Sequence, residues 1–555
     1  MPDFALGCVQ SLANPNLLQI NENASRDTHM PLKMTPVSTL ALLLAAPFAA
    51  HAEAPVQTQW GMVAEPKWPT EICATLPAAI VSRNGSLDAY DADGANTHPD
   101  HDRLQQAIDA CHDGAVKLVA GARGEDAFLI SPIQLKSHVI LWVDKGVTVF
   151  ASRDPKDYDT GAGDCGTANH EGHKSCHSLF EGRDLDHAGI IGDGKIDARG
   201  GSRLLSGPNK GAKSWWDVAW QSKQGFVQHN FRILQTEGGR DFLMYRITFE
   251  NSPNFHLVPT GDGLIAWNIK ILAPSSVYTV PNYACPAGST PDVNPSATCF
   301  TPDTIKNTDG FDPSNASHVL LAYSWISDGD DDVAIKAGGK ILSSNQTYAH
   351  NHFYYGHGMS LGSETNGGAE HFVITDLVMD GKDSPEGNGI RLKSDASRGG
   401  KVRDFLFEHV CMKNEAHPLV FDTHYSDKTG TLDPDFQGVV VRDMHYFAGG
   451  KYGTGVSTFR GYEQDGARLP IEVTLDNVLW TGGAPGISTG HSKADGTAFA
   501  AHITLAGTNS FKDVFKASPP DDVTVTIKEP FAPAPVIGCD GVFVPLSSVL
   551  ADSPI

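Results

Sequence analysis

Hydrophobic residues come in short runs along most of this chain, separated by turns rich in glycine, asparagine and aspartate. The runs show little helical period, and many are rich in valine and isoleucine, which is typical of strands. Early examples lie at residues 116–120, 128–135, 139–150 and 190–196. The pattern predicts a strand-rich fold from residue 116 onward.

One early segment has the spacing of a helix instead. Capping and acidic residues at 99–102 come before it, and Asp113-Gly114 follows it,. The apolar positions on its shared face are Leu104, Ala107, Ile108 and Cys111,. We therefore expect a short helix that caps the N-terminal end of the strands.

The strand units also recur at a loose period. The hydrophobic positions that align from unit to unit are Ile247, Ile269, Trp325, Phe353, Leu377, Val410, Met444 and Val478. The gaps between them are 22, 56, 28, 24, 33, 34 and 34 residues. Strand-and-turn repeats of this size are typical of a solenoid in which each coil stacks on the last. The sequence therefore predicts an all-β parallel β-helix, with a jelly roll or sandwich as the alternative.

Composition narrows the class of protein. The 555 residues are 40% hydrophobic and 19% charged, with 56 glycines and 34 prolines. This is typical of a turn-rich globular chain and unlike a disordered one. The formal net charge of −23 disfavours nucleic acid and an anionic membrane surface as partners,. An acidic substrate would therefore need a local cluster of basic side chains.

The N-terminal residues have the features of a secretion signal. Lys33 precedes an apolar run at 37–50, and Ala50-His51-Ala52 has the small-x-small form of a cleavage site,. A buried helix at 37–50 is the alternative. We expect an upstream segment before the true start (1–29), a signal peptide (30–52), a lead-in (53–84) and a β-helix domain (85–545). The mature protein is then secreted through the periplasm to the extracellular space, with no membrane association.

The cysteines fit an oxidising compartment. Removal of Cys8 with the signal segment leaves eight, an even number,. Metal ligation is the alternative, but no Cys-x-x-Cys occurs,. The expected disulfides are Cys165–Cys176 and Cys285–Cys299 across local loops, Cys73–Cys111, and Cys411–Cys539 as the remainder. We expect no metal and no cofactor.

Charged residues gather in four segments between residues 307 and 393. The segments are Asn307-Thr308-Asp309-Gly310, Gly329-Asp330-Asp331-Asp332, Gly356-His357-Gly358 and Arg391-Leu392-Lys393. Equivalent positions on neighbouring coils of a β-helix lie about 4.8 Å apart, so these side chains can converge on one face. Arg391 and Lys393 flank Leu392 on a strand, so both should point away from the core. Carboxylates suit acid/base cleavage of a glycosidic bond, and a basic pair suits an acidic sugar.

In this order and at these gaps, the four segments resemble the signature motifs of the polygalacturonases, glycoside hydrolase family 28. Further segments at 251–256, 333–336, 358–364 and 418–425 are similar to those of bacterial endopolygalacturonases of soft-rot plant pathogens. The resemblance covers roughly residues 85–479. It implies a single-stranded right-handed parallel β-helix without a metal. It also implies endo-hydrolysis of α-1,4 bonds in de-esterified homogalacturonan, with inversion. We expect the protein to act as a monomer.

The resemblance also implies roles for single residues. Asp330 would be the general acid, Asp309 and Asp331 would hold and deprotonate the attacking water, and His357 would support the protonation state of the acid. Substrate-binding positions would be Arg391, Lys393, Tyr425 and Asn307. Mutual repulsion should raise the pKa of at least one clustered carboxyl group. An inverting acid and base should stand roughly 6.5–9.5 Å apart. Asp332 replaces a neutral residue of the family pattern, and we expect it in a turn or at the rim.

Several alternatives stay open from the sequence. Taken singly, Asp309 could be a turn residue, His357 a surface histidine, and Arg391 with Lys393 a solvated strand face. An exo-acting polygalacturonase could use the 285–299 loop to close one end of the cleft. Rhamnogalacturonan hydrolases depart from the Asn-Thr-Asp and Arg-x-Lys motifs. A pectate lyase would use calcium and elimination, and a β-helix adhesin or pectin-binding protein would need no carboxylate cluster.

Overall fold

The computed structural model describes residues 53–83, 86–92, 94–275, 300–426, 428–464, 467–488, 501–517, 523–528 and 538–551. From Glu53 onward the chain belongs to one compact unit. The expected upstream segment and signal peptide, and the expected Cys285–Cys299 pair, lie outside the described residues. No helix in these ranges is long and apolar enough to cross a membrane.

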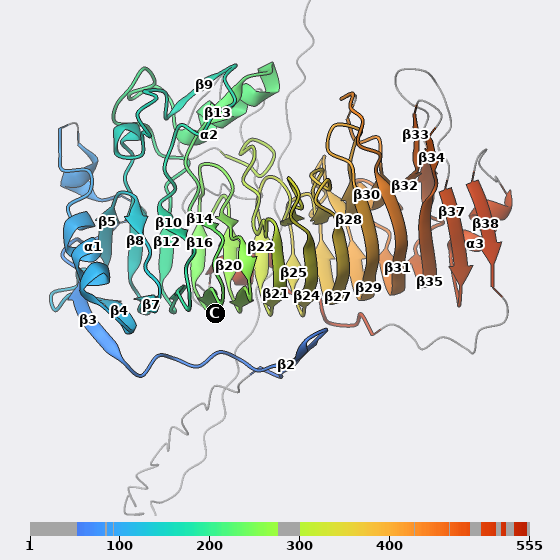
Figure 1. The fold of residues 1–555 in the computed structure, drawn as a ribbon, viewed down its shortest axis with the longest axis horizontal. Coiled ribbons are helices and arrows are strands. Elements are labelled where there is room, and N and C mark those ends of the chain that lie inside the picture. The colour runs from blue at the N-terminus through green and yellow to red at the C-terminus, as the bar shows by residue number, and fades with distance from the viewer. Residues whose placement is uncertain are drawn as a thin grey trace, which may run out of the picture. The chain divides into compact units, whose positions relative to one another are not determined.

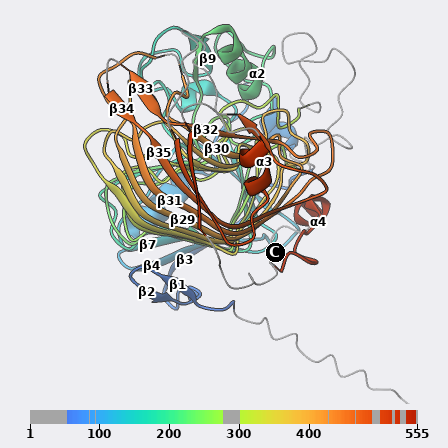
Figure 2. The same cartoon turned by 90° about the vertical axis from the view of Figure 1, so that its right-hand side faces the viewer.

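Parallel strands stack side by side along one axis and make a right-handed parallel β-helix, as expected (Figure 1). The longest sheet has 22 strands, and it bends around a corner of the coil, because several coils contribute two of its strands each (Figure 2). Its first half comprises β3 (Ile72–Pro77), β4 (Gly114–Val119), β5 (Ala127–Ile130), β7 (Val139–Val143), β8 (Thr148–Ala151), β11 (Gly189–Ile191), β12 (Lys195–Asp197), β15 (Leu243–Tyr245), β16 (Thr248–Glu250), β18 (Gly261–Asp262) and β19 (Ile265–Trp267). The rest comprises β20 (Lys270–Leu272), β21 (Ala316–Ala322), β22 (Trp325–Ser327), β24 (Ser343–Ala349), β25 (His352–Phe353), β27 (Ala369–Asp380), β29 (Lys401–Lys413), β31 (Asp435–Phe447), β35 (Ile471–Thr481), β37 (Ala501–Ala506) and β38 (Val523–Ile527).

A second ladder of parallel strands runs along the opposite side of the coil and carries the four charged segments. Its two sheets are joined at Phe311, which bridges Leu257 on one side and Val333 on the other. The strands, in order, are β6 (Ile133–Gln134), β10 (Phe180–Arg183), β14 (Leu234–Glu237), β17 (Leu257–Val258), β23 (Val333–Ile335), β26 (Met359–Leu361), β28 (Asn388–Lys393), β30 (His417–Asp422), β32 (Val456–Arg460) and β36 (Gly486–Ser488). Each charged segment therefore lies on its own coil of one continuous face.

The helices and the short antiparallel pairs lie at the ends and edges of the coil. The expected helix is α1 (His101–Ala110), in which Leu104 and Ile108 are buried. The other helices are α2 (Trp215–Trp220), α3 (Phe511–Ala517) and α4 (Leu546–Ala551), with 3-10 turns η1 (Asp88–Asp91), η2 (Pro155–Asp157) and η3 (Gln221–Gln224). The antiparallel pairs are β1 (Val56–Thr58) with β2 (Gly61–Val63), β9 (Thr167–Asn169) with β13 (Val227–His229), and β33 (Tyr462–Gln464) with β34 (Ala467–Leu469).

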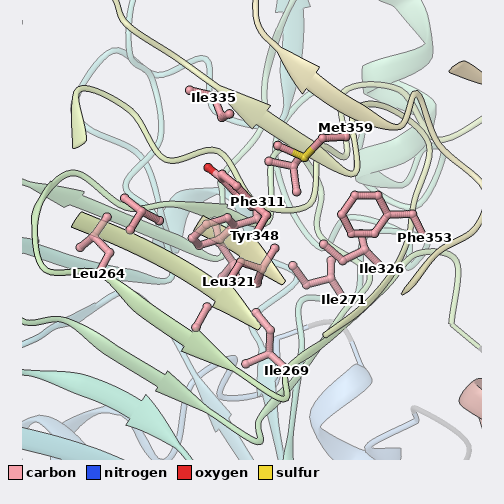
Figure 3. Packing of buried hydrophobic residues seen from close by; sticks show 14 of the residues in the cluster. Leu264, Ile269, Ile271, Phe311, Leu321, Ile326, Ile335, Tyr348, Phe353 and Met359 are labelled. Atoms are coloured by element: carbon pink, nitrogen blue, oxygen red, sulfur yellow. The ribbon is translucent and has the colours of Figure 1, made fainter. Parts of the chain in front are cut away.

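The interior is filled by side chains that stack from coil to coil. Ile271, Ile326 and Phe353 occupy one register on three successive coils, and they point toward one another (Figure 3). Each is almost fully buried. Burial of one such side chain contributes about 1.5–3 kcal/mol, so the stack repeats a similar gain at every turn.

The sequence alignment of the repeats is correct at its C-terminal end and wrong in the middle. Leu377, Val410, Met444 and Val478 pair in one register, as expected. Trp325, however, pairs with Lys270 rather than Ile269. Its ring lies outside the coil, where it stacks on His352 at 3.9 Å and packs against the cluster that includes α4. Trp325 is therefore hydrophobic because it packs on the outside of the coil, and not because it fills the interior.

Three disulfides join described residues, and each is an expected pair. They are Cys73–Cys111, Cys165–Cys176 and Cys411–Cys539. The last one ties the chain after residue 538 to β29, 128 residues earlier.

The early runs at 128–135, 139–150 and 190–196 each divide into two strands, because a coil turns a corner within each run.

Candidate active site

The four charged segments meet on the outer face of the second ladder, one coil after another. The backbone N–H of Gly310 donates to the carbonyl of Asp331 at 2.9 Å, and that of His357 donates to the carbonyl of Asp330 at 2.6 Å. Asp309 and Asp330 therefore lie on neighbouring coils, as the spacing predicted. Their carboxyl groups are 20 or more residues apart in sequence and are brought together by stacking alone.

Asp330 is bound to the imidazole of His357. Nδ1 of His357 lies 3.1 Å from Oδ1 of Asp330, and Nδ2 of Asn307 donates to Oδ2 at 3.3 Å. Burial raises the pKa of Asp330, but the charge of His357 outweighs it and holds that pKa below its usual value. Burial lowers the pKa of His357, and Asp330 together with Glu386 raises it above the ordinary value. The pair thus holds one proton, which rests on the ring.

Asp331 is enclosed by cations. Its carboxylate accepts from a guanidinium N–H of Arg391, from Nζ of Lys393 at 2.8 Å and from the hydroxyl of Ser360 at 2.9 Å. Burial acts to raise the pKa of Asp331, yet Arg391 and Lys393 lower it far below its usual range. Leu392, between the two cations, is buried in the core, so the expected alternation along β28 is confirmed.

Among the three carboxyl groups predicted to be catalytic, Asp309 is the one whose pKa is raised. Burial is the main cause, followed by the charges of Asp330 and Asp312, and the net pKa lies well above the ordinary value. The one basic group of the described residues within 4 Å is Nζ of Lys336, at 3.7 Å. That ammonium lies closer to Asp312, at 2.7 Å, and over the ring of Phe255 at 4.0 Å. The expected rise from clustering therefore falls on Asp309 and not on Asp330.

Asp332 lies in a turn, one of the two places expected for it, but it is buried and not at the rim. Its side chain is buried, and Oδ2 accepts the backbone N–H of Gly358 at 3.0 Å. A Cβ on Gly356 would lie 2.6 Å from the same oxygen, and Gly356 has a φ of +153°, so this position suits only glycine,. Burial raises the pKa of Asp332 well above its usual value, and Asp331 adds to the rise. The residue lies in the turn before β23, where side chains do not alternate between the two faces as they do along a strand.

Glu386 belongs to the site but had no signal in the sequence. Its carboxylate lies 3.4 Å from Nε2 of His357, opposite Asp330, and 3.4 Å from Nζ of Lys223. It comes from the turn between β27 and β28, which matches none of the four motifs. The hydrogen bond from His357 lowers the pKa of Glu386 far below its usual range. The ring of His357 is thus held between two carboxylates.

The remaining predicted residues lie around this centre. Tyr425 is 47% exposed, and Nζ of Lys393 lies 5.1 Å from the centre of its ring. Asn307 adopts a φ of +55° and accepts from Nε2 of Gln228 at 3.0 Å. Asn307 also borders a cavity of about 470 Å³ over the earlier coils, whose walls include Gln228, Arg232, Asn254 and Phe255. The structure therefore brings all eight predicted residues to one region.

A metal ion could reach three ligand atoms here. One atom each of Asp330, Asp331 and His357 lie within 4.8 Å of one another. However, Arg391 and Lys393 already place two positive charges on Asp331. A divalent ion would meet their repulsion, so the site fits an acidic sugar better than a cation.

Comparison with known proteins gives one family. The profile of the glycosyl hydrolases family 28 matches residues 124–490. A polygalacturonase of Ralstonia solanacearum is 49% identical over 93% of this chain and 99% of its own length. An endo-polygalacturonase of Pectobacterium carotovorum subsp. carotovorum is 36% identical over 68% of this chain and 83% of its own. A solved polygalacturonase from Erwinia carotovora ssp. carotovora superposes with a TM-score of 0.61 at 33% identity, covering 77% of this chain and 96% of the other. The chain is therefore a glycoside hydrolase and belongs to family 28.

Proposed function

We propose that this protein is a secreted endo-polygalacturonase that hydrolyses α-1,4-galacturonosyl bonds of de-esterified homogalacturonan with inversion. The observation that carries the proposal is the acid cluster beside a buried Arg391–Lys393 pair in a protein of net charge −23. The names of its relatives agree, since they are polygalacturonases and endo-polygalacturonases.

The proton for the leaving oxygen comes from the His357–Asp330 pair. The ring of His357 holds it in the free site, and the 3.1 Å hydrogen bond leads it to Asp330. Asp330 then passes it to the glycosidic oxygen as the bond to the anomeric carbon breaks. Glu386, on the far side of the ring, stabilises the imidazolium before the transfer. The pair titrates as a unit, so its proton is lost only above the raised pKa of His357,.

The attacking water is held by Asp309 and Asp331. Asp309 has the raised pKa and is the stronger base once ionised, so it takes the proton from water as the oxygen bonds to the anomeric carbon,. Asp331 stays ionised because Arg391 and Lys393 stabilise its charge, and it orients the water. The active form has Asp309 ionised and the His357–Asp330 pair protonated. Activity should therefore rise with pH as Asp309 ionises and fall again as the pair loses its proton.

Arg391 and Lys393 bind the carboxylate of a galacturonate unit. An arginine carries five N–H donors and a lysine three, more than Asp331 and Ser360 accept from them. Tyr425 offers an exposed ring next to Lys393, on which a sugar can pack,. Methyl esterification would remove the charge that this pair recognises, so a de-esterified chain is the expected substrate.

Binding residues lie on both sides of the acid cluster along the coil axis. The cavity beside Asn307 reaches back to Gln235 on β14, and Tyr425 follows β30. These coils span six steps of about 4.8 Å, or roughly 29 Å. A site with room for sugar units on either side of the broken bond suits internal cleavage. The three disulfides suit the oxidising compartment of a secreted enzyme, which we expect to be monomeric,.

The test compares viscosity with reducing ends during digestion of polygalacturonate by the purified mature chain. Internal cleavage predicts a steep fall in viscosity while few bonds are broken. Release of short sugars with viscosity preserved would show exo action and overturn the endo assignment. Products that absorb as unsaturated uronides would show elimination and overturn hydrolysis. The anomeric form of the first product, followed by proton NMR, distinguishes inversion from retention.

A further inference from the structure

A second cluster of ligand-type side chains lies away from the acid cluster, on the wall of the cavity beside Asn307. It consists of Asp164, His173 and His229, and one ligand atom of each lies within 4.8 Å of the others. Asp164 and His173 come from the loop closed by the Cys165–Cys176 disulfide, and His229 ends β13. The disulfide and the β9–β13 pair fix both parts of the backbone.

Two distances within the cluster are close to the edges of a tetrahedral zinc site. Nε2 of His173 lies 3.2 Å and Nε2 of His229 lies 3.6 Å from Oδ2 of Asp164. Zn–N and Zn–O bonds of about 2.0–2.2 Å at tetrahedral angles place ligand atoms about 3.3–3.6 Å apart. Two histidines and one carboxylate are also a ligand set that zinc takes in proteins. Asn169 borders the cluster, and its Oδ1 lies 2.7 Å from Nε2 of His229.

The surrounding hydrogen bonds hold these ligands in the required states. Nδ1 of His229 lies 2.6 Å from the hydroxyl of Ser175, and when Nδ1–H donates to it, the lone pair of Nε2 is available to an ion,. Nδ2 of Asn169 donates to Oδ2 of Asp164 at 3.1 Å and so orients that carboxylate. The oxygen of Asn169 is oriented by the backbone N–H of Glu171, at 2.7 Å.

Burial adds a reason for a cation at this point. His229 is 3% exposed, whereas His173 is half exposed, so the cluster opens to solvent on one side only. An ion could enter from the exposed side and bind His229 on the buried side. It would join the disulfide loop to β13, and both line the cavity that ends at Asn307.

We propose that Asp164, His173 and His229 form a binding site for one divalent transition-metal ion of the zinc class. The ion fixes the loop at residues 164–176 against β13 and so stiffens the cavity wall. Its role is structural, because no described residue of the acid cluster belongs to it. The proposal is independent of the polygalacturonase assignment.

The test is calorimetric titration of ZnCl2 into the mature chain after treatment with chelator, at pH 7. Wild type should bind one equivalent, and saturating zinc should raise its melting temperature. His173→Gln and Asp164→Asn should each weaken zinc binding at least about tenfold. Both side chains are on the loop and not in the core, so these variants should fold. His229→Gln should abolish binding, and circular dichroism shows whether that buried variant is folded.

His170→Gln is the matched control. His170 lies on the same loop but stacks on Phe226 and is outside the cluster, so its substitution should leave zinc binding unchanged. Absence of zinc binding by wild type would overturn the proposal. Binding that survives His173→Gln and Asp164→Asn but is lost in His357→Gln would place the ion in the acid cluster, and would overturn it equally.

Discussion

Asp331 and Asp332 are adjacent in the chain, and both are buried, but their carboxyl groups lie in opposite electrostatic surroundings. Asp331 faces Arg391 and Lys393, which hold its pKa far below the usual range. Asp332 turns inward, where a backbone N–H is its hydrogen-bond partner and burial raises its pKa well above that range. Two equally buried carboxyl groups therefore differ in charge. Asp331 is ionised because cations lie beside it, whereas Asp332 keeps its proton.

The same division runs through the whole acid cluster. Asp330 and Asp331 each have a cationic partner and are ionised, whereas Asp309, Asp328 and Asp332 have pKa values raised chiefly by burial. Asp309 is intermediate between these two groups, since it has a cation nearby, but that cation, Lys336, is shared with Asp312. One site can therefore hold ionised and protonated carboxyl groups at the same pH.

The largest expected effect is on activity, from Asp330→Asn. The amide cannot pass a proton to the leaving oxygen, so release of reducing ends from polygalacturonate should fall about 10³-fold or more. Asp332→Asn is the matched control, two residues along, and should keep most of the activity. If both variants lose activity to the same extent, the proposed difference in function between Asp330 and Asp332 is wrong.

Asp331→Asn should have the largest effect on stability. It leaves Arg391 and Lys393 buried without their common counter-ion, which costs about 3–5 kcal/mol of unfolding free energy in such settings. Urea denaturation at pH 7 measures it. Because the folded pKa of Asp331 is lowered, its stabilising contribution exists above the ordinary aspartate pKa and is lost as pH falls,. The variant should therefore approach wild type in stability at acidic pH, and a constant deficit from pH 7 to pH 3 would contradict this account.

Asp332→Asn should act in the opposite sense. The folded pKa of Asp332 is raised, so the folded chain holds a proton that the unfolded chain releases above the ordinary aspartate pKa. Wild type thus loses stability as pH rises through this window, and the amide does not. We expect the variant to equal wild type near pH 4 and to be about 1–2 kcal/mol more stable at pH 7. Thermal melts across that range measure the difference, and a variant less stable at pH 7 would contradict the prediction.

Much of the site could be predicted because the coil repeat converts sequence spacing into contact. Asp309, Asp330, His357 and Arg391 lie on successive coils, so their order along the chain is their order in space. The late repeats were aligned correctly because β27, β29, β31 and β35 are long and have nearly equal spacing. Trp325 was placed one residue out, because hydrophobic character alone does not tell the coil interior from a covered outer face.

Two parts of the site could not be predicted from spacing. Three consecutive aspartates before β23 give no sign of which one turns inward, because a turn has no fixed side-chain alternation. Glu386 reaches His357 from a turn that matches no motif, and its position depends on how that turn folds over the face. Both are contacts between a turn and a coil, which the repeat period does not specify.

Glu386→Gln should give the smallest effect and is the finest test of the comparison. Glu386 raises the pKa of His357 and so extends the pH range in which the His357–Asp330 pair keeps its proton. The amide should move the alkaline limb of the activity profile to lower pH. The Glu386 side chain is 54% exposed, so solvent screens its charge, and the shift should be less than about one pH unit,. The acid limb, which follows Asp309, should not move. Glu364→Gln is the control, because Glu364 pairs with Arg398 and not with His357. A shift of the acid limb alone would mean that the ring of His357 does not carry the proton of the pair.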